Sequence, residues 1–250
     1  MATRSVSYMG SWRYEPAADL NQPLAERLRR FPREPDLMVY GLRAVAAVVL
    51  RTWLRLYHNL AVEGQNHLPL GQSFVMVANH GSHLDTLCLL SALPLRNLHR
   101  AFPAAARDYF FVSMPRLAMA AIVVNALPFG RQSHIRQSLD LCRGLLENPG
   151  NILILFPEGT RTSNGEIGEF KPGIGMLLAG SKIPVVPCHL SGAFEAWPKG
   201  KWFPRPHSLR LKIGKARTYD TLAANRDSST QICCDLREAV IGLKTTRERA

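Results

Sequence analysis

The stretch that decides the fold of this chain covers residues 74–90 and reads FVMVANHGSHLDTLCLL. Its first four residues are all apolar, which predicts a strand, and residues 87–90 begin a helix-like apolar run. Between these two segments, Gly81 and Ser82 give the backbone the freedom to turn. The sequence therefore predicts a strand, a turn and a helix, with polar side chains gathered at the turn.

A histidine and an aspartate frame this turn. His80 follows the strand, and Asp85 lies five residues later, early in the helix. This spacing lets the Asp85 carboxylate fold back onto one ring nitrogen of His80 and leaves the other nitrogen as an acceptor. A histidine oriented in this way can be a general base, and no serine or cysteine nucleophile is needed if the substrate brings its own hydroxyl. The alternative is that the spacing is accidental and Asp85 only caps the helix.

A second informative stretch covers residues 152–162 and reads ILILFPEGTRT. Four apolar residues in a row predict a strand buried on both faces, which is typical of a sheet covered by helices. Ligands of open α/β sheets bind at the carboxyl ends of strands, where this chain has a glutamate, a glycine, a threonine and an arginine. The donor fork of Arg161 matches a phosphate. The alternative is a surface turn in which Glu158 and Arg161 form a local ion pair.

The composition favours one globular domain with a polyanionic partner. The 250 residues are 46% hydrophobic, enough for a sizeable core. The net charge of +12 suggests nucleic acid, an acidic carrier protein or an anionic membrane as the partner. The five cysteines show no C-x-x-C spacing and are typical of small buried side chains in a reducing compartment. Residues 1–35 are polar and basic, without the apolar core of a signal peptide.

Residues 36–58 predict a helix with Asp36 as its N-cap. Arg43, Arg51 and Arg55 share one face of it, and most of the remaining surface is apolar. The apolar stretch between Arg43 and Arg51 is far shorter than the roughly 20 residues that span a bilayer. We therefore expect residues 1–58 to be a basic lead and an amphipathic, membrane-associating helix at the membrane–water interface. The alternative is a helix packed on the domain with its arginines in water.

Residues 59–250 are expected to form the catalytic domain, with strand-like and helix-like segments in alternation. The predicted elements are strands at 62–68 and 74–77, a surface segment at 96–108, a helix at 135–146, a strand at 183–190, a half-exposed edge strand at 209–213 and a last helix around 232–243. Residues 109–127 are uniformly apolar, so their periodicity does not distinguish a buried helix and strand from a second membrane-facing segment.

The chain resembles the glycerolipid acyltransferases of the 1-acylglycerol-3-phosphate acyltransferase type over roughly residues 60–215. Residues 79–85, NHGSHLD, match the family's N-H-x-S-x-x-D block, which contains the H-x4-D pair. Residues 156–162, FPEGTRT, match its F-P-E-G-T-R-S block, with Thr162 in place of serine. These two blocks together carry the resemblance.

Two further blocks stand in the family's order. Residues 129–131, FGR, lie where the family has a block that ends in arginine, although Gly130 replaces the usual acidic residue. Residues 183–187, IPVVP, match its proline-bearing strand. Arg131 is therefore carried over as a helper in phosphate binding.

The resemblance implies an α/β fold, with a mixed, largely buried sheet flanked by helices, and an O-acyltransferase of phospholipid biosynthesis. His80 would deprotonate the free hydroxyl of a lysophospholipid, with 1-acylglycerol-3-phosphate as the first choice and other lyso-lipids as alternatives. Asp85 would hold His80. The pocket for the acceptor, including its phosphate, would be formed by Glu158, Gly159, Thr160, Arg161, Arg131 and Lys171.

The resemblance also implies the partners. The acyl group would come from acyl-coenzyme A or acyl carrier protein as co-substrate, with no other cofactor and no metal, and the enzyme would act on the cytoplasmic side of the cell membrane. Two alternatives stay open. One is a basic membrane-binding or nucleic-acid-binding module without catalysis, which the charge supports but no nucleic-acid motif does. The other is a metal site of His80, His83 and Asp85, whose spacing is poor for ligands.

Overall fold

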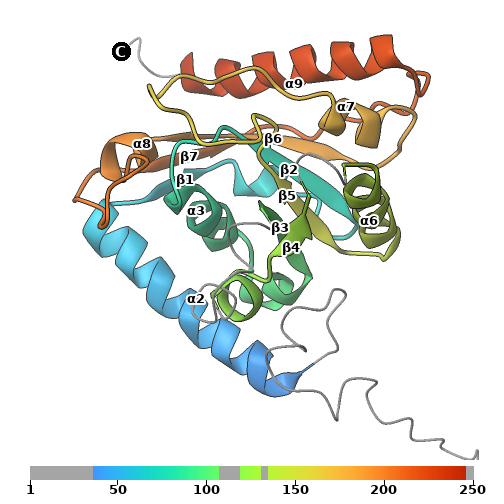
Figure 1. The fold of residues 1–250 in the computed structure, drawn as a ribbon. Helices are drawn as coiled ribbons and strands as arrows, with labels where there is room; N and C mark the ends of the chain where they lie inside the picture. The colour runs from blue at the N-terminus through green and yellow to red at the C-terminus, as the bar shows by residue number, and fades with distance from the viewer. Residues whose placement is uncertain (1–35, 107–118, 131–134, 246–250) are drawn as a thin grey trace, which may run out of the picture.

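The structure is a computed structural model that describes residues 36–106, 119–130 and 135–245. Within these residues one sheet of seven strands forms the middle layer, in the order β1-β7-β6-β2-β5-β3-β4 (Figure 1). Neighbouring strands are parallel, except for the antiparallel pair β6 and β7. The strands are β1 (Ala61–Glu63), β2 (Phe74–Ala78), β3 (Ala101–Ala106), β4 (Leu127–Phe129), β5 (Ile152–Leu155), β6 (Val185–Ser191) and β7 (Arg210–Ile213).

Helices cover both faces of the sheet, as Figure 1 shows. Along β2, Phe74 and Met76 point into one apolar layer, whereas Val75 and Val77 point into the other. The first layer is closed by α2 (Leu37–His58), α3 (Leu84–Ala92) and α8 (Ala193–Ala196). The second is closed by α6 (Ile135–Glu147), α7 (Gly173–Leu178) and α9 (Arg226–Thr245). Because a strand alternates its side chains, a run that is apolar at every position must be covered on both faces. The predicted mixed, buried sheet is confirmed.

Three local predictions were wrong. The strand expected at 62–68 ends at Glu63, because Gly64 turns the chain with a φ of 80° into the short helix η1 (Gln65–His67). The surface segment expected at 96–108 contains a short helix, η2 (Leu95–Arg100), and then β3, which pairs with β5 on one side and β4 on the other. The strand expected at the sheet edge, β7, is paired on its outer side by β1. A local glycine turn ended the first strand, whereas pairing with a distant segment decided the other two cases over local composition.

The described part of the uniform apolar segment is a helical turn and a strand. Met119–Val123 form η3, a single π-helical turn, and β4 follows at Leu127–Phe129. Between them Asn125 takes a left-handed φ of 57° and donates its side-chain amide to the carbonyls of His99 and Ala101. This asparagine therefore joins η3 to the start of β3.

Helix α2 lies along the first layer of helices, and two of its three arginines, Arg43 and Arg51, turn inward, whereas Arg55 is exposed. Arg43 is buried and donates hydrogen bonds to the carbonyls of Ile122 (2.8 Å) and Ala121 (3.0 Å) and to Oδ1 of Asn125 (3.1 Å). Arg51 donates to carbonyls at the C-terminal end of α3. Burial lowers the pKa of Arg43 to about 10, so the guanidinium stays charged at neutral pH. The alternative of a packed helix with its arginines in water is wrong for these two residues.

The outward surface of α2 is consequently apolar. Its exposed large side chains are Leu37, Met38, Leu42, Val45, Val48, Val49, Leu56 and Tyr57. By length and composition alone the helix could cross a membrane. Because Arg43 and Arg51 turn inward, they do not limit the apolar outer surface as the sequence suggested, and its exposed polar side chains are Thr52 and Arg55.

The inward position of Arg43 predicts a large effect on stability. Arg43→Ala removes three hydrogen bonds from a charged donor and leaves their buried acceptors unpaired, so we expect the free energy of unfolding to fall by about 3 kcal/mol. Arg55→Ala, at an exposed position on the same helix, should change it by less than about 0.5 kcal/mol. Urea unfolding followed by tryptophan fluorescence measures both variants. Similar small losses would contradict the inward anchoring of α2.

Candidate active site

The two informative stretches emerge side by side at one edge of the sheet. β2 and β5 are parallel neighbours, with Phe74 opposite Ile152 and Val77 opposite Leu155. Because the ends of parallel neighbours coincide, the turn after β2 meets the turn after β5. The backbone N–H of Thr162 donates to the carbonyl of His80 at 2.8 Å and ties the two turns together.

One carboxylate oxygen organises the turn after β2. Oδ2 of Asp85 accepts from Nδ1 of His80 at 2.8 Å and from the backbone N–H groups of Gly81 at 2.7 Å and Ser82 at 2.8 Å. Asp85 is fully buried, whereas 18% of the His80 side chain is exposed. Asp85 lies in the first turn of α3, so it stabilises the start of the helix and orients the histidine at once. The predicted contact of Asp85 with His80 is present.

The ring of His80 is held on a second side by Phe156, stacked on it with ring centroids 4.1 Å apart. Because the carboxylate of Asp85 only accepts, the hydrogen-bond network assigns the ring proton to Nδ1. Nε2 is then an acceptor, and it makes no hydrogen bond within the described part of the chain. This nitrogen is the atom that His80 offers to a substrate.

Glu158 binds backbone groups instead of Arg161. Its Oε1 accepts from the N–H of His80 at 2.7 Å, and its Oε2 accepts from the N–H of Gly168 at 2.9 Å. Burial raises the pKa of the Glu158 carboxyl, and the two N–H donors act in the opposite direction. The local ion pair with Arg161 does not form. Glu158 therefore holds the turn after β2 (residues 79–83), the candidate catalytic turn, to the loop that follows the second motif.

Two cationic side chains border the turn after β5. Gly159 takes a left-handed φ of 71°, and a Cβ at this position would lie 2.9 Å from Nζ of Lys171. Glycine thus lets the ammonium group of Lys171 approach the turn closely. Neither Lys171 nor Arg161 forms a side-chain hydrogen bond or ion pair with another described residue. The exposed Thr160 lies between Gly159 and Arg161 in the chain.

The last predicted phosphate ligand, Arg131, lies outside the described residues. For the metal alternative, no group of three His, Cys, Asp or Glu side chains in the described ranges could hold a metal ion. The ring of His83 lies against that of Trp197, with centroids 5.5 Å apart.

Sequence reasoning missed two residues that join the turn after β2 to other elements, Asn79 and Ser82. The side chain of Asn79 donates to the carbonyl of Leu190 at 3.0 Å and accepts from its N–H at 2.8 Å, which joins the end of β2 to β6. Oγ of Ser82 donates to the carbonyl of Trp197 at 2.9 Å. The signal that could have identified Asn79 and Ser82 is that both occupy defined positions of the N-H-x-S-x-x-D block.

The sequence is similar to those of known acyltransferases. A chloroplastic 1-acyl-sn-glycerol-3-phosphate acyltransferase of Arabidopsis thaliana is 32% identical over 147 residues, which cover 58% of this chain and 39% of that protein. The 1-acyl-sn-glycerol-3-phosphate acyltransferase alpha of Homo sapiens is 32% identical over 131 residues, 52% of this chain and 44% of that protein. The match thus spans less than half the length of these relatives.

A solved structure shares the fold. The 1-acyl-sn-glycerophosphate acyltransferase PlsC of Thermotoga maritima superposes with a TM-score of 0.63 at 23% identity, over 84% of this chain and 81% of that one. A family model described as Acyltransferase matches residues 59–191, more than half of the chain. This range contains both turns of the site. The chain belongs to the acyltransferase family.

Proposed function

We propose that the chain is an O-acyltransferase that moves an acyl group from a thioester to the free hydroxyl of a lysophospholipid. The observation that carries the proposal is the open Nε2 of His80, oriented by Asp85, on a turn joined to the turn after β5, where Arg161 and Lys171 have no side-chain partner among the described residues. The relatives, which are named 1-acyl-sn-glycerol-3-phosphate acyltransferases, support this lipid as the acceptor. The product is then phosphatidate.

The chemistry follows from the position of the proton on His80. The acceptor hydroxyl gives its proton to Nε2 while its oxygen bonds to the thioester carbonyl carbon. Asp85 stabilises the imidazolium that results. The tetrahedral intermediate then collapses, the carbon–sulfur bond breaks, and the leaving thiolate takes the proton back from Nε2. The products are an ester and a free thiol, from coenzyme A or acyl carrier protein.

The acceptor is held by its phosphate. Arg161 offers a planar fork of donors that can make two charge-assisted bonds, and Lys171 adds a point charge beside Gly159. Arg131 is the third cation that we assign to this pocket. The backbone contacts of Glu158 give it a positioning role in the same pocket, since both of its oxygens are occupied.

The lipid substrate is reached from a membrane surface. The outward face of α2 carries eight large apolar side chains, and its inward face is anchored through Arg43. We assign α2 to the membrane–water interface, with its outward side chains in lipid, because a spanning position would break the inward hydrogen bonds. Both proposed donors are cytoplasmic, so the site faces that side of the membrane.

Removing the base tests the reaction itself. His80→Ala should lower acyl transfer to 1-acylglycerol-3-phosphate by about 10²–10⁴-fold, because the hydroxyl loses its proton acceptor. Asp85→Asn should cause a loss of similar size, since Nδ1 loses its carboxylate acceptor. His83→Ala should retain most of the activity. The measurement is release of free thiol from acyl-coenzyme A or acyl carrier protein, with circular dichroism to confirm folding. Near wild-type turnover in folded His80→Ala protein would refute the assignment.

The positioning role of Glu158 predicts a particular kinetic pattern. Glu158→Gln replaces one oxygen by an amide that cannot accept from a backbone N–H, so the catalytic turn loses one of its supports. We expect kcat to fall by at least about tenfold with little change in the KM for the acceptor. Glu169→Gln, at an exposed position in the same loop, serves as the matched control. A large rise in KM at constant kcat would instead place Glu158 in direct contact with the acceptor.

The role of Arg161 predicts a dependence on the acceptor's phosphate. Arg161→Lys should raise the KM for 1-acylglycerol-3-phosphate markedly, because lysine cannot reproduce the two-bond geometry, and Arg161→Ala should nearly eliminate turnover. Both losses should be small for an uncharged monoacylglycerol. The measurement is kcat/KM for both acceptors in the wild type and the two variants. Equal proportional losses for the two acceptors would mean that Arg161 serves the fold or the acyl donor.

A further inference from the structure

A loop on the catalytic domain exposes two adjacent aromatic side chains. Residues 197–207 follow α8, and within them the Trp202 and Phe203 side chains are 88% and 82% exposed. No other aromatic side chain in the described ranges is exposed to this extent. Neighbouring exposed aromatic side chains are typical of an interaction site, since their burial is strongly favourable.

The loop is held in shape by hydrogen bonds at its base. Nε1 of Trp197 donates to the carbonyl of Lys201 at 2.7 Å. Arg205 donates from Nε to the carbonyl of Glu195 at 2.8 Å and from its backbone N–H to the carbonyl of Ala196 at 2.9 Å. Three prolines in the loop further restrict the backbone. Trp202 and Phe203 are therefore presented on a constrained support.

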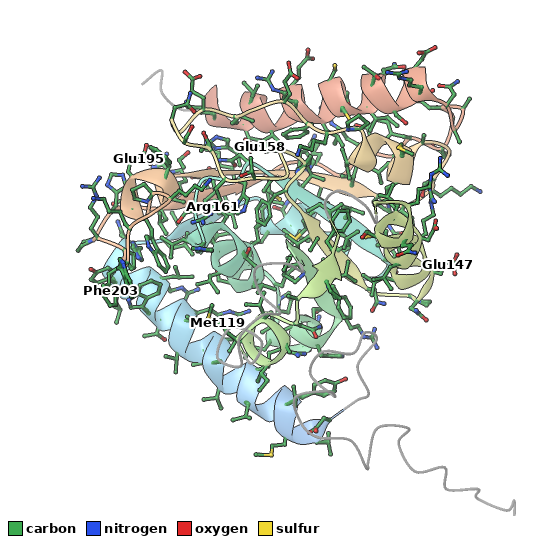
Figure 2. All side chains as sticks on the ribbon, in the orientation of Figure 1. Met119, Glu147, Glu158, Arg161, Glu195 and Phe203 are labelled. Carbon is green, nitrogen blue, oxygen red and sulfur yellow. The ribbon has the colours of Figure 1, made fainter. Side chains whose placement is uncertain are left out.

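The loop extends the apolar outer surface of α2. The hydroxyl of Tyr57, near the C-terminal end of α2, donates to the carbonyl of Pro204 at 3.2 Å. Leu56, exposed beside Tyr57, belongs to the same outer surface. Figure 2 shows Phe203 at this end of α2. The aromatic pair thus lies next to the face that we assign to lipid, although it belongs to a separate part of the chain.

The charge of the loop indicates the kind of partner. Lys199, Lys201 and Arg205 flank the aromatic pair and are exposed, and residues 196–207 contain no acidic side chain. Aromatic side chains bordered by cations suit the interface of an anionic bilayer, where the rings lie among the headgroups and the cations contact lipid phosphates.

The same loop also contacts the catalytic turn. Its first residue, Trp197, accepts a hydrogen bond from Ser82 and packs its ring against His83. We propose that residues 198–206 form a second membrane-contact element, which inserts Trp202 and Phe203 into an anionic lipid surface and holds the catalytic turn at that surface. This inference deepens the proposed function and rests on it for the substrate, but its binding readout does not require acyl transfer.

The first experiment measures binding of the full chain to vesicles of phosphatidylglycerol and phosphatidylcholine by sedimentation. The double variant Trp202→Ser/Phe203→Ser should bind at least tenfold more weakly, because each ring loses its burial in lipid. The control variant is Met176→Ser, which changes an exposed apolar residue of α7, on the side of the sheet opposite to α2. It should bind like the wild type. Unchanged binding of the double variant would overturn the proposal.

Charge variants separate electrostatic attraction from insertion. Lys199→Ala/Lys201→Ala should weaken binding to the anionic vesicles severalfold and leave binding to pure phosphatidylcholine nearly unchanged. Lys182→Ala/Lys215→Ala, at exposed positions elsewhere, should show a smaller effect.

Lipids with brominated chains should quench a tryptophan signal that disappears in Trp202→Phe. Absence of this quenched component would contradict insertion.

Measurements of acyl transfer then test the membrane contact separately from the proposed function. With a short-chain acceptor that is monomeric in water, Trp202→Ser/Phe203→Ser should match the wild type, whereas transfer to a vesicle-borne acceptor should fall in parallel with binding. Equal losses on both acceptors would overturn the proposal in favour of a structural role. A change in oligomeric state with unaltered vesicle binding would identify the pair as a protein interface and overturn it. If the wild type binds as expected but acylates no lyso-lipid, the proposed function fails while the membrane contact stands.

Discussion

The site depends on a single carboxylate oxygen, Oδ2 of Asp85, which accepts one hydrogen bond from the His80 ring and two from the backbone of the turn. A buried carboxylate is stable only when such donors compensate for the water that it loses. The same three donors shape the turn, begin α3 and select the His80 tautomer with an open Nε2. The backbone of this turn and the tautomer of its histidine are therefore set by the same carboxylate oxygen.

This turn is braced from several elements that lie far apart in the sequence. Glu158 holds the N–H of His80, Thr162 holds its carbonyl, and Asn79 joins the end of β2 to β6. Each contact gives a partner to a backbone or side-chain group at the end of a strand, where the sheet no longer supplies one. The result is a histidine held by several distant elements, as the general base that we propose would require, next to a turn whose two cations have no side-chain partner among the described residues.

Much of the fold could be predicted because its patterns are local. Four consecutive apolar residues in β2 and in β5 indicated strands covered on both faces, and the structure has helices on each side. The pattern at 101–106 gave no such indication, since alanine and proline have low strand propensity and only pairing with β4 and β5 makes this segment a strand. The orientation of α2 was equally hidden. In the sequence, the row of arginines suggests a face exposed to solvent. In the structure, Arg43 instead donates to Asn125 and to the carbonyls of η3.

For the site, the sequence by itself determined the pairing of His80 with Asp85, because residues five apart across a strand, turn and helix meet through local geometry. It also determined that the FPEGTR block follows a buried strand. Only the tertiary structure decided that the two blocks lie side by side, that Glu158 binds backbone N–H groups while Arg161 stays unpaired among the described residues, and that Ser82 reaches the loop of Trp202 and Phe203 through Trp197. The physical reason is the range of the interactions. Turns and helix starts form between near neighbours in the chain, whereas the partners of a buried carboxylate or an inward arginine are chosen by the packing of segments about 80 residues apart.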